Sequence, residues 1–112
     1  MDDSSILNYY VSLREGLALS DLTMNHAILI HDKVLNSKFG DRFDSFVLAS
    51  SCIYLASRYR DTPRTLKQVN TVGGITRKDI ARCYRLLRKN NSEIGFILPE
   101  SYRYDPNLKD WR

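Results

Sequence analysis

The sequence predicts an all-α domain: five helices form a bundle around a central apolar helix, and the final pair is helix-turn-helix-like. Apolar residues recur at helical spacing between capping residues and breakers, and no segment shows the alternation that is typical of a strand. The run FVLASSCIYLA is apolar on nearly every side, as expected of a helix that other helices enclose. Two short capped segments flank Gly73 and Gly74, which is the layout of a helix-turn-helix. A chain of 112 residues has the size of one domain.

The first two helices are predicted over residues 5–15 and 20–37. Ser4 or Ser5 is the expected N-cap of the first helix, and Gly16 is expected to end it. Ser20 is the expected N-cap of the second helix. The predicted buried face of the second helix consists of Thr23, Ala27, Ile30, His31 and Val34, and is widened by Met24, Ile28 and Leu35.

Both histidines of the chain fall in the second helix. His31 lies on the apolar face, where we expect a hydrogen-bonded core histidine rather than a metal ligand, because no second ligand-type residue stands at a suitable spacing. His26 is expected to point outward into solvent.

The third helix is predicted over residues 43–60, with Pro63 preventing its continuation. Its small residues favour close helix packing, which explains them better than nucleophilic serine chemistry because no base is nearby. They are Ala49, Ser50, Ser51, Cys52 and Ala56. Cys52 and Cys83 belong to no CxxC pair, so we expect two buried free thiols, no zinc site and a reducing cellular interior.

Two capping boxes define the fourth and fifth helices. Thr65 with Gln68 opens the fourth, and Thr76 with Asp79 opens the fifth, which is predicted to continue to residue 90. The expected buried side of the fourth helix contains Leu66, Val69 and Val72. The expected buried side of the fifth contains Ile80, Cys83, Tyr84 and Leu87, and its opposite side carries Lys78, Arg82, Arg85 and Lys89.

Positive charge is concentrated in one third of the chain. Residues 58–89 contain ten Lys or Arg and only two Asp or Glu, whereas residues 1–57 contain four and seven. This pattern favours a polyanion-binding face over a solvated helix surface with intramolecular partners, because two acids cannot pair with ten cations locally. The candidate nucleic-acid or partner contacts are Arg58, Arg60, Arg64, Lys67, Arg77, Lys78, Arg82, Arg85 and Lys89.

The C-terminal residues 91–112 are predicted to form an extension without a helical period. We expect Ile94, Phe96, Ile97 and Leu98 to pack back on the bundle. Tyr102, Tyr104 and Trp111 alternate with arginines, so they either stack on bases or anchor a packed extension or linker.

Signatures of several other functional classes are missing. The chain has no GxSxG, HExxH, Walker-type or dinucleotide-binding glycine motif, so we expect no enzyme activity and no cofactor. The longest apolar run is too short to cross a membrane, and the acidic start does not resemble a signal peptide.

The ordered run CIYLASR, TPRTL and ITRKDIARCYRLL closely resembles the first cyclin-like repeat of general transcription factor IIB and of its archaeal counterpart. LALSDLTMNHAI resembles the second helix of that repeat, and PESYR resembles the linker to a second repeat. The resemblance implies a cyclin-like repeat over residues 1–90 and a linker-like extension over residues 91–112. The chain departs from the family pattern at Gly40-Asp41-Arg42 and at the loop RDT, and its 112 residues contain neither a zinc ribbon nor a second repeat. It is compatible with both an excised domain and a natural short relative.

The resemblance implies binding to the complex of TATA-binding protein and promoter DNA, with RNA polymerase contacted only indirectly or through regions outside these residues. By position it favours Arg64, Lys67, Arg77 and Lys78 as contacts, with Arg82 and Arg85 as weaker candidates. It also implies an intracellular location: the nucleus of a eukaryote, or the cytoplasm for an archaeal protein or a viral one in an archaeal host. Two alternatives remain open, a cyclin-like protein-interaction domain without DNA binding and an autonomous operator-binding helix-turn-helix.

Overall fold

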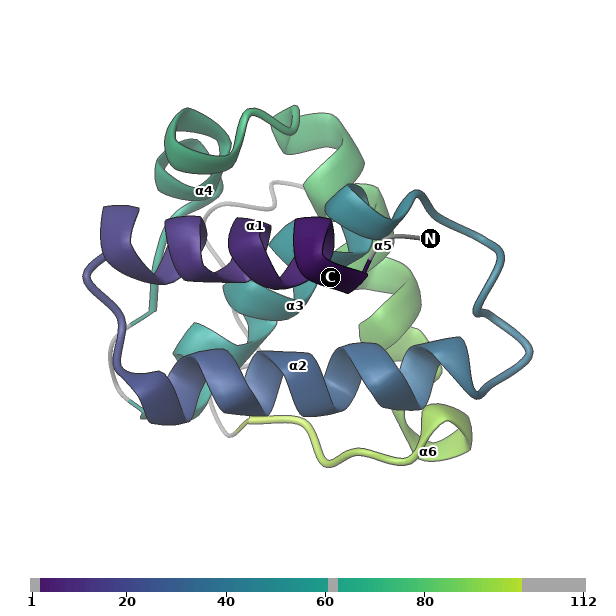
Figure 1. Ribbon diagram of the computed structural model, residues 1–112. Helices are drawn as coiled ribbons and strands as arrows, with labels where there is room; N and C mark the ends of the chain where they lie inside the picture. Colours follow the sequence, from purple (N-terminus) through teal and green to yellow (C-terminus); the bar gives the residue numbers. More distant parts are fainter. Residues whose placement is uncertain (1–2, 61–62, 100–112) are drawn as a thin grey trace.

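The computed structural model describes residues 3–60 and 63–99, which form helices and contain no strand. The five main helices form a bundle, as predicted. They are α1 (Asp3–Gly16), α2 (Asp21–Leu35), α3 (Ser45–Ala56), α4 (Leu66–Gly73) and α5 (Arg77–Lys89). Figure 1 shows the others arranged around α3. A 3-10 turn, η1 (Ser57–Arg60), continues α3, and a single-turn helix, α6 (Asn91–Ile94), follows α5. This arrangement confirms the all-α bundle with a central helix.

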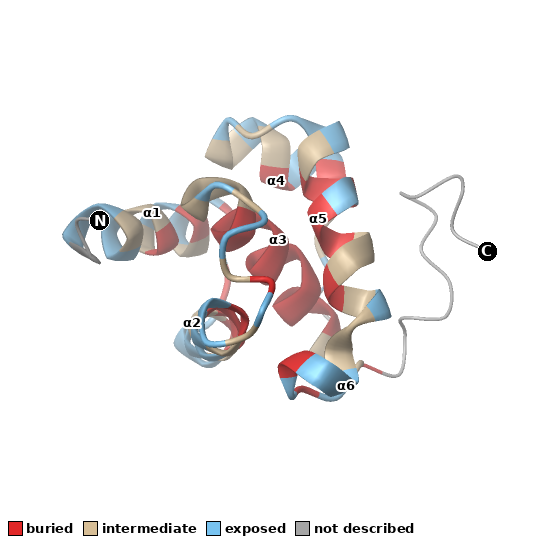
Figure 2. Ribbon diagram, turned by 90° about the vertical axis from the view of Figure 1, so that its right-hand side faces the viewer, coloured by how far each residue is buried: buried red, intermediate tan, exposed pale blue. Residues whose placement is uncertain are grey.

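Helix α3 is the centre of the bundle. Every residue from Leu48 to Ala56 is buried, and the helix is surrounded by α1, α2, α4 and α5 in the burial view (Figure 2). Its small side chains leave room for these neighbours, because interiors are packed at crystal-like density. The apolar run of the sequence therefore forms the core helix, as expected.

Helix caps explain most of the element boundaries. The hydroxyl oxygens of Ser20, Thr65 and Thr76 accept hydrogen bonds from the backbone amides three residues later, at 3.1, 3.0 and 3.2 Å, as predicted. The cap predicted for the first helix is wrong, because α1 begins at Asp3 and both Ser4 and Ser5 lie inside it.

The start of α3 also differs from the prediction. The Asp44 carboxylate accepts from the amides of Phe46 and Val47, at 2.9 and 3.3 Å, so the helix begins after Asp44 rather than at Phe43. An aspartate is a strong N-cap because its oxygen satisfies amides that have no acceptor within the helix.

Tyr9 joins three helices at the side of the bundle that carries α4. Its hydroxyl donates to the carbonyl of Gly73 at 2.8 Å and lies 2.6 Å from the Ser50 hydroxyl. Gly73 is the last residue of α4, and Gly74 follows it with φ = 78°, a left-handed conformation that suits glycine. These contacts set the position from which α5 departs.

His31 is the hydrogen-bonded core histidine that the sequence predicts. It is 4% exposed, and its Nδ1 lies 2.7 Å from the hydroxyl of Tyr10. Burial lowers the pKa of His31 from its ordinary value of 6.5, and the nearby charge of Asp32 partly opposes this change.

The domain is expected to lose stability when the pH falls below about 6.5. The pKa of His31 is lower in the folded chain than in the unfolded chain, so the unfolded chain takes up the proton first and acid favours unfolding. Urea midpoints at pH 7.5 and 5.0 measure the effect for the natural chain and for His31→Gln. The drop in midpoint should be smaller in the variant, and equal drops would contradict this role of His31.

Three predicted side-chain positions are wrong. Leu35 is 46% exposed and Ile97 is 83% exposed, although Ile94 and Phe96 do pack on the bundle. His26 is half-buried rather than exposed, because its ring packs against the tilted ring of Tyr59 with centroids 4.2 Å apart. The two rings line a groove of about 920 Å³ between α2 and residues 95–99. The aromatic residues predicted beyond Pro99 lie outside the described residues.

Cys52 and Cys83 are buried free thiols, as expected. Burial raises the pKa of both thiols, to about 12 for Cys83, so they stay protonated at neutral pH. None of the helices in the described ranges combines the length and the apolar character needed to cross a membrane.

Candidate nucleic-acid interface

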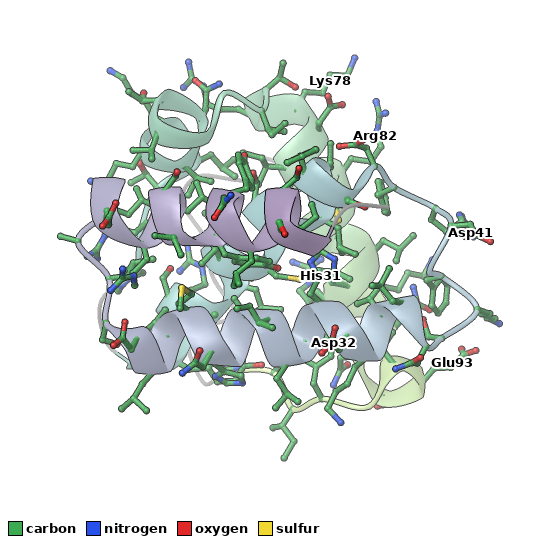
Figure 3. The ribbon with its side chains drawn as sticks, in the orientation of Figure 1. His31, Asp32, Asp41, Lys78, Arg82 and Glu93 are labelled. Carbon is green, nitrogen blue, oxygen red and sulfur yellow. The ribbon has the colours of Figure 1, made fainter. Side chains whose placement is uncertain are left out.

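Helix α5 has two chemically opposite faces. Ile80, Cys83, Tyr84 and Leu87 are fully buried against the bundle, which confirms the predicted packing side. The cations of the opposite side project away from it, and Figure 3 shows Lys78 and Arg82 at the outer edge of the molecule. We call the exposed residues Lys78, Arg82 and Lys89 of that side, together with Arg77 at the exposed start of the helix, the cationic face of α5.

The first turn of α5 combines two exposed cations with backbone amides that have no acceptor within the helix. Arg77 and Lys78 are the first two residues of the helix, so their amides have no acceptor within it. The hydroxyl of Thr76 already satisfies the amide of Asp79. A helix N-terminus flanked by basic side chains is a favourable position for a phosphate group.

Most cations of this face form no ion pair with a carboxylate of the described residues. Among the residues that the structure describes, Arg77, Lys78 and Lys89 take part in no ion pair. Arg82 lies 4.0 Å from Asp79, with both side chains well exposed to solvent, and such a pair contributes little. None of the described acids in the first half of the chain pairs with this face: Asp21, for example, pairs with Arg14 at 2.8 Å.

Arg85 and Lys67 lie outside the cationic face of α5 as defined above. Arg85 shares the predicted stripe but is half-buried, so it is less accessible than Arg82. Lys67 is exposed on α4, in a groove of about 330 Å³ between α4 and the end of α1. Thr71 lies one helical turn after Lys67 and also lines this groove. Thr71 is not among the predicted contacts, although its spacing of four residues from Lys67 places both on one side of α4.

The expectation that Arg58 belongs to the outer cationic surface is wrong. Arg58 is only 8% exposed, and its guanidinium donates to the hydroxyl of Tyr54 at 3.1 Å. The guanidinium carbon also lies 4.9 Å from the centroid of the Tyr54 ring, within cation–π range. The two residues are four apart on consecutive helical turns, which brings their side chains together. Arg58 therefore stabilises the end of α3.

The guanidinium of Arg64 forms hydrogen bonds within the domain. Its Nε donates to the carbonyl of Leu17 at 2.9 Å, and its Nη2 donates to that of Ala18 at 3.2 Å. Ala18 has φ = 53°, an unfavourable left-handed conformation for a residue other than glycine. The guanidinium thus holds the α1–α2 turn against the segment before α4. The side chain of Arg60 lies outside the described part of the structure.

The family model and the curated relatives that match this chain carry the same family name. Residues 9–90 match the family model described as transcription factor TFIIB repeat. The chain is 43% identical over 42 residues to transcription initiation factor IIB of Xenopus laevis and to that of Homo sapiens, a match that covers 38% of this chain and 13% of each relative. The Drosophila melanogaster protein is 44% identical over 41 residues, with coverage of 37% and 13%. The matched segment is thus a small part of each relative.

Proposed function

Because the chain belongs to the transcription factor TFIIB repeat family, we propose that it is a transcription-initiation factor module that binds the complex of TATA-binding protein and promoter DNA. The unneutralised cationic face of α5 is the observation that carries this proposal. Phosphate contacts position a protein on a duplex without reading its bases, so we propose binding with little sequence specificity.

The proposed DNA and partner contacts are the accessible cations. Arg77 and Lys78 contribute most, because their charges add to the positive end of the helix dipole. Arg82 and Lys89 extend the contact along α5, and Lys67 supplies a separate contact on α4. Arg64 and Arg85 have a secondary role, and Arg58 has none, because it is buried.

The proposal concerns a binding role rather than catalysis. In this proposal RNA polymerase is contacted only indirectly or through regions outside these 112 residues. The role places the protein at promoters, in the nucleus of a eukaryote or in the cytoplasm of an archaeal cell.

Residues 1–90 form the repeat in this proposal, and residues 91–112 form a linker-like extension whose first part packs on the bundle through Ile94 and Phe96.

The double substitution Arg77→Ala with Lys78→Ala is expected to weaken formation of the promoter complex without unfolding the domain. Both side chains are exposed, so the core is untouched. Each lost phosphate contact reduces the salt dependence, so the slope of log K against log salt should become shallower by about two. Fluorescence anisotropy on a TATA duplex, with TATA-binding protein present and salt varied, measures both quantities.

The matched control removes two cations elsewhere. Lys38→Ala with Arg42→Ala changes the net charge equally, but the two residues lie in the loop between α2 and α3. The control should keep the natural slope. If complex formation is unchanged in Arg77→Ala with Lys78→Ala, the start of α5 is not part of the site. If the natural chain fails to bind the duplex at low salt, with or without TATA-binding protein, a pure protein-interaction domain is favoured instead.

A further inference from the structure

A small apolar pocket lies between α1 and α2. Its volume is about 190 Å³, and its walls include Ile6 and Leu7 of α1 with Ile28 and Leu35 of α2. The larger groove beside residues 95–99 adjoins the undescribed residues 100–112, so the smaller pocket is the better defined of the two. The volume is suited to one bulky apolar side chain of a partner.

Two leucines at the pocket remain accessible to solvent. Leu7 is 52% exposed and Leu35 is 46% exposed, although both are large apolar residues. Single exposed leucines are common on protein surfaces, but two from different helices that line one pocket form a local apolar patch. A side chain inserted between them would remove apolar surface of both leucines from water.

The described lining of this pocket carries one charge, which is negative. Among the described residues of its lining, Asp32 alone carries a charge; it is exposed, and it forms no ion pair with any described residue. Figure 3 shows Asp32 on α2, far from Lys78 and Arg82 at the opposite edge of the view. Residues 1–57, which contain the pocket, hold seven acidic and four basic residues. A positively charged group is therefore the electrostatic complement of this surface.

We propose that this pocket binds a short segment of a partner protein that carries a bulky apolar side chain beside a lysine or arginine. The apolar side chain enters between Leu7 and Leu35, and the cation pairs with Asp32. The occupant is a protein and not a nucleic acid, because the Asp32 carboxylate repels phosphate. The surface is separate from the cationic face of α5, so this binding does not depend on the proposed contact with promoter DNA.

A titration with two synthetic peptides tests the proposal. Both are 12-residue amphipathic peptides with leucine and tryptophan four residues apart, one flanked by lysines and the other by glutamates. Amide shifts of the 112-residue chain are followed by NMR at pH 7.5. We expect the basic peptide to shift the amides of Leu7, Asp32 and Leu35 and to bind about tenfold more tightly than the acidic peptide, with affinity falling as salt is added.

Matched variants locate the site. Leu7→Ser and Asp32→Asn should each weaken binding of the basic peptide by about fivefold or more. The controls are Leu22→Ser, at a leucine of α2 that is 66% exposed outside the pocket, and Asp41→Asn, at an exposed acid in the loop before α3. Both controls should bind as the natural chain does. Equal affinity for the two peptides, or equal losses in the controls, overturns the proposal. The proposal is also overturned if the amides of Leu7, Asp32 and Leu35 shift when only the protein concentration is raised. That result would mean that a second copy of the chain covers the pocket.

Discussion

The substitution Ile80→Asp is expected to unfold the domain. Ile80 is 0% exposed in the middle of the buried face of α5, and its backbone carbonyl accepts from the Ser51 hydroxyl of α3 at 3.3 Å. A carboxylate buried at this position in the apolar core costs several kcal/mol. The loss of the apolar side chain adds to that cost. The sum is comparable with the whole free energy of unfolding of a small domain, about 5–15 kcal/mol.

Circular dichroism and urea denaturation measure this effect. The variant should lack the cooperative transition of the natural chain. Ile97→Asp is the matched control, because the same chemical change is made at an isoleucine whose side chain is 83% exposed. The control should change the free energy of unfolding by about 0.5 kcal/mol or less. A stably folded Ile80→Asp variant would mean that α5 does not pack through this face.

The parts of the fold that follow from local chemistry were predictable. The division of α5 into a buried face and a cationic face follows from the spacing of its residues, because a helix places residues three and four apart on the same side. The caps at Ser20, Thr65 and Thr76 were equally visible, because their oxygens bond to amides within the next turn. Local sequence also predicted correctly that Arg77, Lys78, Arg82 and Lys89 lie on the surface.

The parts that depend on distant residues were not predictable. Arg64 looked like a free loop cation, but its acceptors are carbonyl groups 46 and 47 residues earlier in the chain. His26 looked exposed until Tyr59 was brought against it by the packing of the bundle. Residues 94–98 show no periodicity, so their sequence did not distinguish buried Phe96 from exposed Ile97. Charge counting alone therefore overestimates a binding surface, since it includes cations such as Arg58 that stabilise the interior.

The substitution Gly73→Ala is expected to destabilise the domain by about 1–3 kcal/mol. A Cβ atom at Gly73 would lie 2.5 Å from the hydroxyl oxygen of Tyr9 and 2.9 Å from a methyl carbon of Leu13. Both neighbours belong to α1, so the added methyl group pushes α1 and α4 apart. The hydrogen bond from Tyr9 to the carbonyl of Gly73, 2.8 Å long, is then strained or lost. Urea denaturation measures the change.

A double-mutant cycle separates this contact from backbone strain. Tyr9→Phe removes the oxygen that the new methyl group meets first, so it should cost less in the Gly73→Ala background than in the natural chain. Gly74→Ala is the control: its strain comes from φ = 78°, and no atom lies within 4 Å of the added carbon, so Tyr9→Phe should cost the same there as in the natural chain. Additive effects at Gly73 would show that the Tyr9 hydroxyl does not fix the end of α4. Coupling at Gly73 alone would show that α1 sets the position of the turn leading to α5, and with it the direction in which Arg77 and Lys78 face.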